Sequence, residues 1–282
     1  MQRTLRPILF ILVFLSITPS ARAESAQKCF SEETICVKSR TDNGRVTLDI
    51  SNANPYPVSV QFKLTLQNMA SDSGLEFFEV IEEEDSLRFA ELRQIDPDQG
   101  YRWNYTIQTY YGSFAAEHDD DHVYDLPYAP GKSYRVGQGY NGTFSHSDDF
   151  NRYGLDFFME EGEAVHAARG GIVIGAEGRY TTGGITGGHK PNYVRILHND
   201  GTVGIYLHLK PRGALVRAGQ RVKQGQLIGL SGNTGYSSRP HLHFAVMTVK
   251  EGVGHVSLPT VFRTADEDRV TITFNTYPVA RD

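Results

Sequence analysis

The chain has 282 residues, of which 39% are hydrophobic and 22% charged, so its composition is that of a folded protein and excludes general disorder. Its formal net charge of −5, without any block of Lys or Arg, argues against nucleic acid as a partner. The 28 Gly, 12 Pro, 15 Tyr and 15 Phe residues favour short strands and tight turns, and the length favours two domains.

The first 23 residues have the pattern of a secretory signal peptide. Arg3 and Arg6 precede an apolar run over residues 8–17, and the Ala-Arg-Ala segment at 21–23 supplies a small-x-small cleavage pattern. The run is too short for a stable membrane anchor, and no Cys directly follows the small residues at 21–23 to carry a lipid. We therefore expect a periplasmic or secreted protein, cleaved near Ala23, whose net charge changes from −5 to −8 because three arginines and no acids are removed.

The two cysteines of the chain, Cys29 and Cys36, lie close together just after this segment. Exported proteins meet an oxidising environment, in which neighbouring cysteines form disulfides. The sequence therefore predicts one short-loop disulfide rather than a metal-binding pair or a catalytic thiol.

Residues 24–120 are expected to form an N-terminal domain of antiparallel strands. Apolar and polar residues alternate there, and Asn43-Gly44 and Asn54-Pro55 mark turns. The strand-like runs are residues 46–50, 58–66, 77–81 and 101–110. This pattern favours an immunoglobulin-like β-sandwich, and nothing in it points to catalysis.

An acidic run at residues 117–122 and a turn-rich segment at 127–131 indicate a domain boundary. The run contains two histidines and could bind metal weakly, although a solvated linker is the simpler interpretation. We expect a second domain over residues 121–282, with a core at about 128–250 and a C-terminal strand extension.

The most specific local feature of this second domain is the sequence His241-Leu242-His243. Residues i and i+2 of a strand point to the same face, so the two imidazoles would share one site while Leu242 points into the core. Two surface histidines on an edge strand would give the same pattern. The surrounding motifs must therefore decide between a shared functional site and two unrelated surface residues.

Four motifs in a fixed order supply that context. They are Gly-Leu-Asp-Phe at 154–157, Tyr-Leu-His-Leu at 206–209, Gly-Asn-Thr-Gly at 232–235 and Pro-His-Leu-His-Phe at 240–244. Together they resemble the lysostaphin/LytM-type zinc metallopeptidases of bacterial cell walls, over residues 128–250. The resemblance implies an antiparallel β-sheet catalytic domain, an all-β chain and one Zn²⁺.

In that family a His, an Asp and the second His of the His-x-His pair bind the zinc, which leaves a fourth position open for water. Asp156 and His243 match two of these ligands. The usual position of the first His is occupied by Arg152, which cannot bind a metal, so His146 is the expected substitute. The weaker alternatives are His189 and His166.

The family also has two histidines that do not bind the metal, and His208 and His241 correspond to them. The resemblance implies that they exchange protons and stabilise the charge that develops during peptide hydrolysis. The glycine-rich loop at 179–190, which contains Tyr180, is expected to border the substrate groove.

The resemblance implies an endopeptidase that hydrolyses peptidoglycan stem-peptide cross-links during cell-wall remodelling. A D-alanyl–diaminopimelate bond is favoured over a pentaglycine bridge, because the signal peptide and the single disulfide fit a Gram-negative periplasm. The alternatives are a catalytically inactive relative that activates wall amidases, and a wall-binding protein that acts through its N-terminal domain. A regulatory envelope partner is compatible with each of these, but the sequence does not identify one.

Overall fold

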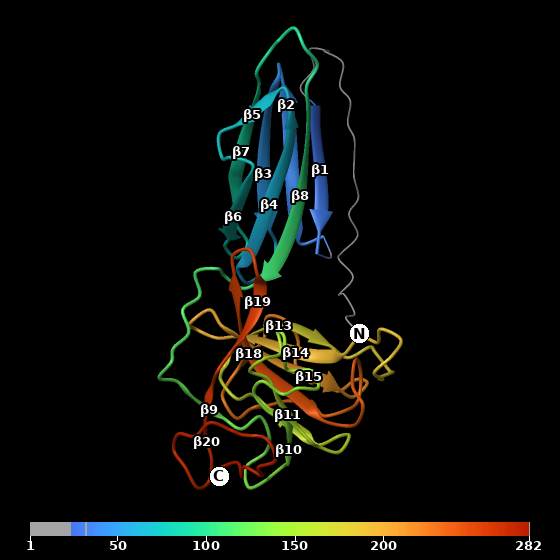
Figure 1. Cartoon of the computed structure of the whole chain (residues 1–282), viewed down its shortest axis with the longest axis vertical. Helices are drawn as coiled ribbons and strands as arrows, with labels where there is room; N and C mark the ends of the chain where they lie inside the picture. Colours follow the sequence, from blue (N-terminus) through green and yellow to red (C-terminus); the bar gives the residue numbers. More distant parts are fainter. Residues whose placement is uncertain (1–23, 32, 282) are drawn as a thin grey trace. The chain divides into compact units, whose positions relative to one another are not determined.

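The computed structural model describes residues 24–31 and 33–281, so the expected signal peptide lies outside the described residues. All regular elements in these residues are strands, which agrees with the all-β prediction. Within the same residues there is no helix with the length and apolar character needed to cross a membrane. The chain divides into two compact units, with the division between Tyr111 and Gly112 (Figure 1).

The first unit contains two antiparallel sheets. One has the strand order β1 (Glu24–Phe30), β2 (Ile35–Asp42), β3 (Arg45–Asn52), β7 (Ser86–Gln94), β5 (Met69–Ser71). The other has the order β6 (Glu76–Ile81), β4 (Val58–Gln67), β8 (Arg102–Tyr111). The strands predicted from sequence alternation are present, whereas the immunoglobulin-like type of this domain stays a prediction.

The two sheets of the first unit share one hydrophobic core. In β3 the alternating residues Val46, Leu48 and Ile50 are buried, as their spacing predicts. The rings of Phe62 in β4 and Phe89 in β7 stack with centroids 4.0 Å apart, and this contact joins the two sheets. Burial of these side chains supplies the main stabilisation of the unit.

The predicted disulfide is present between Cys29 and Cys36. The two residues face each other directly in the register of β1 and β2. The bond therefore fixes the first described strand to its neighbour in the sheet.

The second unit is built around an eight-stranded antiparallel sheet. Its order is β10 (Val136–Gln138), β11 (Leu155–Phe157), β18 (Leu242–Lys250), β15 (Val203–Leu209), β14 (Asn192–Leu197), β13 (Gly171–Glu177), β16 (Arg221–Val222), and β19 (Gly254–Leu258) also pairs with β18. Two smaller sheets pair β12 (Ala164–His166) with β17 (Leu227–Leu230), and β9 (Val123–Asp125) with β20 (Val261–Arg263). The β9–β20 pair is parallel and joins the start of the unit to its last strand.

The acidic run at 117–122 forms a hydrogen bond with a later segment of the second unit. The backbone N–H of Asp119 donates to Asp200 Oδ2 at 3.1 Å, and the Asp200 carboxylate also pairs with the Arg169 guanidinium at 2.5 Å. Next to this ion pair lies His198, whose Nδ1–H donates to the Gly170 carbonyl at 2.9 Å. The run therefore contributes a hydrogen bond to a part-buried polar cluster.

His198 makes the stability of the second unit depend on pH. Burial lowers the pKa of His198 to about 4, whereas an unfolded His has a pKa of about 6.5. Between these values the unfolded chain binds more protons, so acidification favours unfolding. We expect the free energy of unfolding to fall by about 2 kcal/mol more between pH 7 and pH 5 in the wild type than in His198→Asn. Hydrogen exchange of the β14 amides measures this difference, and equal losses in both proteins would contradict it.

Candidate functional site

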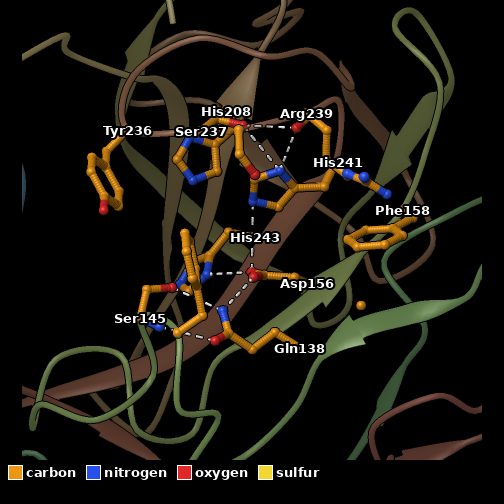
Figure 2. A pocket seen from close by; sticks show the side chains of 13 residues that line it. Gln138, Ser145, Asp156, Phe158, His208, Tyr236, Ser237, Arg239, His241 and His243 are labelled. Atoms are coloured by element: carbon orange, nitrogen blue, oxygen red, sulfur yellow. Dashed lines mark hydrogen bonds and ion pairs between the residues drawn. The ribbon is translucent and has the colours of Figure 1, made fainter. Parts of the chain in front are cut away.

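Three neighbouring strands of the large sheet bring the expected site residues together. Asp156 in β11 lies directly opposite His243 in β18, and His243 in turn lies opposite Leu207 in β15. His241 immediately precedes β18, so it shares a side of the sheet with His243. The pocket formed there is lined by Asp156, His208, His241 and His243 (Figure 2).

His146, Asp156 and His243 form a buried group that could hold a metal ion. One potential ligand atom from each residue lies within 4.8 Å of the others. Asp156 Oδ1 is 2.8 Å from His243 Nδ1 and 3.3 Å from His146 Nε2. Two imidazoles and a carboxylate are ligands suited to zinc, and three protein ligands leave a coordination position open.

His146 is oriented toward this group by its other ring nitrogen. Its Nδ1–H donates to the Gly139 carbonyl at 3.0 Å, which leaves the lone pair on Nε2. This Nε2 is buried and has no hydrogen-bond partner among the described residues. A buried polar atom without a partner is costly, so this arrangement fits a bound cation.

Asp156 is oriented by Gln138, a residue that the sequence did not single out. The Gln138 side-chain N–H₂ donates to Asp156 Oδ2 at 2.9 Å and to Ser145 Oγ at 2.8 Å. One carboxylate oxygen is thereby occupied, and Oδ1 is left facing the two imidazoles. Burial alone would raise the pKa of Asp156, but His146 and His243 lower it well below its ordinary value. Asp156 is therefore an anion at neutral pH.

His208 enters the pocket from a β-bulge. Leu207 pairs with Tyr193 and Leu209 pairs with Asn192, so His208 is the extra residue between them. Its φ of 67° lies in the left-handed region, which is unusual for a residue other than glycine. The bulge turns the imidazole toward His241, and the two ring centroids are 4.6 Å apart.

His208 and His241 are both held by backbone carbonyls. His208 Nδ1–H donates to Thr234 O at 2.7 Å, and His241 Nδ1–H donates to Arg239 O at 2.8 Å. The neutral form of each ring then has its lone pair on Nε2. Burial, together with the nearby imidazoles of His241 and His243, lowers the pKa of His208 to about 3. His208 is therefore neutral at pH 7, with the lone pair of Nε2 available as a hydrogen-bond acceptor.

The residues weighed as alternatives lie outside the metal group. Arg152 forms an ion pair with Asp149 at 2.9 Å. His189 Nδ1 lies 3.1 Å from Thr182 Oγ1, and His166 Nδ1–H donates to the Gly225 carbonyl at 2.8 Å. Tyr180 is not among the residues that line the described pocket, and the position of its loop along a substrate groove stays a prediction.

Gly154 gives His243 the space that it occupies. A Cβ atom at position 154 would lie 2.6 Å from His243 Cε1 and 3.0 Å from the Asn151 carbonyl oxygen. Only glycine avoids both contacts without movement of the ring or the backbone. The Gly-x-Asp motif therefore combines a ligand-type carboxylate with room for the histidine opposite it.

The comparisons with known proteins agree with this geometry. Residues 150–255 match the model of peptidase family M23. The glycyl-glycine endopeptidase ALE-1 of Staphylococcus capitis is 42% identical over 117 residues, which cover 41% of this chain and 30% of that protein. The peptidoglycan DD-endopeptidase ShyA of Vibrio cholerae is 39% identical over 94 residues, which cover 33% of this chain and 20% of that protein.

A longer match includes much of the N-terminal unit. An uncharacterized metalloprotease of Buchnera aphidicola is 28% identical over 242 residues, which cover 80% of this chain and 61% of that protein. The chain thus spans less than two thirds of the length of each of these three relatives. The range matched by the family model contains the four motifs, whereas Gln138 and His146 lie before it. Residues 150–255 therefore belong to peptidase family M23, the lysostaphin/LytM-type family that the sequence motifs resemble.

Proposed function

We propose that this chain is a zinc metalloendopeptidase that hydrolyses the peptide cross-links of peptidoglycan in the cell envelope. The observation that carries the proposal is the buried group of His146, Asp156 and His243 beside the two further imidazoles of the same pocket. In this assignment His146, Asp156 and His243 bind one zinc ion, and His208 and His241 are catalytic. The protein acts in the periplasm or after secretion.

The two catalytic histidines together carry the proton transfer of the hydrolysis. A zinc ion in this site would supply the Lewis acidity that polarises the scissile carbonyl and lowers the pKa of water. His208 and His241 have their Nδ1–H groups fixed, so the Nε2 atom of one of them accepts the proton of the attacking water. The imidazolium formed in this way returns a proton to the departing amine, so the protons balance over one cycle.

The names of the relatives support a cell-wall substrate. One relative is a glycyl-glycine endopeptidase and another is a peptidoglycan DD-endopeptidase, so both cleave peptide bonds. We propose stem-peptide cross-links as the substrate of this chain, with the D-alanyl–diaminopimelate bond favoured. A catalytically inactive activator of wall amidases remains the alternative outcome of the test below.

Metal analysis combined with digestion of isolated peptidoglycan sacculi tests the proposal. We expect about one zinc per wild-type chain and release of cross-link fragments, and we expect His146→Ala to lose both. The matched control is His189→Ala, which removes a histidine outside the metal group and should retain both. A wild-type protein that binds no zinc and releases no fragments would contradict the proposal and favour the inactive relative.

A further inference from the structure

Arg239 is a cation at the edge of the pocket that the proposed chemistry does not use. Its guanidinium lies 5.0 Å from the centroid of the Phe158 ring, and both residues line the pocket. Figure 2 shows Arg239 and Phe158 on one side of the pocket and Tyr236 on the other. Stacking on an aromatic ring holds a guanidinium in place and leaves its N–H edge free to bind a ligand.

A second arginine strengthens the positive charge at this edge. The Arg135 guanidinium lies 5.1 Å from the same Phe158 ring, and its Nε is buried without a hydrogen-bond partner among the described residues. Within the described chain, neither Arg135 nor Arg239 has a carboxylate within ion-pairing distance. Two unneutralised guanidinium groups on one ring, in a chain of negative net charge, favour an anionic ligand at this place.

The backbone connects this cation to the proposed catalytic machinery. The Arg239 carbonyl accepts hydrogen bonds from His241 Nδ1–H at 2.8 Å and from Ser237 Oγ–H at 2.8 Å. Arg239 is thus fixed two residues before His241, at one end of the pocket. An anion bound to Arg239 would therefore occupy the same pocket as the imidazole of His241, rather than a separate site.

The favoured substrate has a carboxylate next to its scissile bond. In a D-alanyl–diaminopimelate cross-link, the carbon that bears the scissile nitrogen also bears a free carboxylate. A glycine bridge has no such group next to its scissile bonds. We infer that Arg239, stacked on Phe158, binds this carboxylate and selects cross-links whose leaving amine carries one; the inference rests on the proposed peptidase function.

Two substrates that differ only at this carboxylate test the inference. One is a peptide dimer joined by a D-alanyl–diaminopimelate bond, and the other is the same dimer with that diaminopimelate carboxylate converted to an amide. For the zinc-loaded wild type we expect kcat/KM to be about tenfold higher for the carboxylate, the size expected of one charge-assisted contact. In Arg239→Gln the ratio should fall to about one.

Two variants control for the loss of a charge. Arg239→Lys keeps the charge but lacks the planar group that stacks on Phe158, so we expect an intermediate ratio. Arg217→Gln removes an exposed arginine outside the pocket and should keep the wild-type ratio. Because both substrates are compared on one protein sample, a change in the fraction of active enzyme cancels from the ratio.

The outcomes separate this inference from the proposed function. Equal cleavage of both substrates by the wild type, or an unchanged preference in Arg239→Gln, overturns the role of Arg239 and leaves the peptidase function intact. Failure of the wild type to cleave either dimer overturns the peptidase function, and the inference with it.

Discussion

Replacement of Asp156 by Asn is expected to remove both the bound zinc and the hydrolytic activity. Asn keeps the size of the side chain, but one of its two polar atoms is an N–H₂ group that cannot bind a metal. If its oxygen accepts the hydrogen bond from Gln138, the N–H₂ group takes the place of Oδ1, which faces His146 and His243. We expect the zinc content to fall from about one to near zero and kcat/KM to fall by about 10³-fold or more.

Asp149→Asn provides the matched control for this experiment. Asp149 is an exposed carboxylate that pairs with Arg152, so the same chemical change occurs near the site but outside the metal group. Zinc content and activity should stay within about twofold of wild type, since exposed ion pairs contribute little. If Asp149→Asn lost zinc as Asp156→Asn does, the segment around Arg152 would have to be part of the metal site.

Local sequence patterns are sufficient to predict the pairing at the centre of the site. The period of two in a strand places His241 and His243 on one side, and the family motif brings Asp156 toward them. The sheet register confirms that Asp156 and His243 face each other. His146 was expected as the substitute for the first His of the family, whose usual position is occupied by Arg152, and the structure brings His146 into the same group.

Other features of the site depend on contacts between residues far apart in the chain. Gln138 is opposite Asp156 only because a register shift near Gly137 offsets β10 from β11. The bulge at His208 requires a positive φ at a residue other than glycine, which no local propensity indicates. The stacking of Arg239 on Phe158 joins residues 81 positions apart, so the sequence alone could not predict it.

The N-terminal unit shows the same division between local and long-range information. Alternating residues predicted its strands, because one side of each strand is buried and the other is exposed. The order of the strands in each sheet depends on pairing across long distances, such as that of β3 with β7. The pattern of buried residues therefore did not determine which strands are neighbours.

Replacement of His208 by Asn is expected to separate the metal site from proton transfer. Asn tolerates the left-handed φ of 67° at this position, so the bulge in β15 should persist. His208 lies outside the metal group, and zinc content should therefore remain near one. Without the imidazole that accepts a proton, kcat should fall by about 10²- to 10⁴-fold, with a smaller change in KM.

His189→Asn, the same change outside the pocket, should leave the zinc content and kcat unchanged. Loss of zinc in His208→Asn would instead show that His208 supports the metal ligands, and a decrease of less than about threefold in kcat would exclude it as a proton carrier.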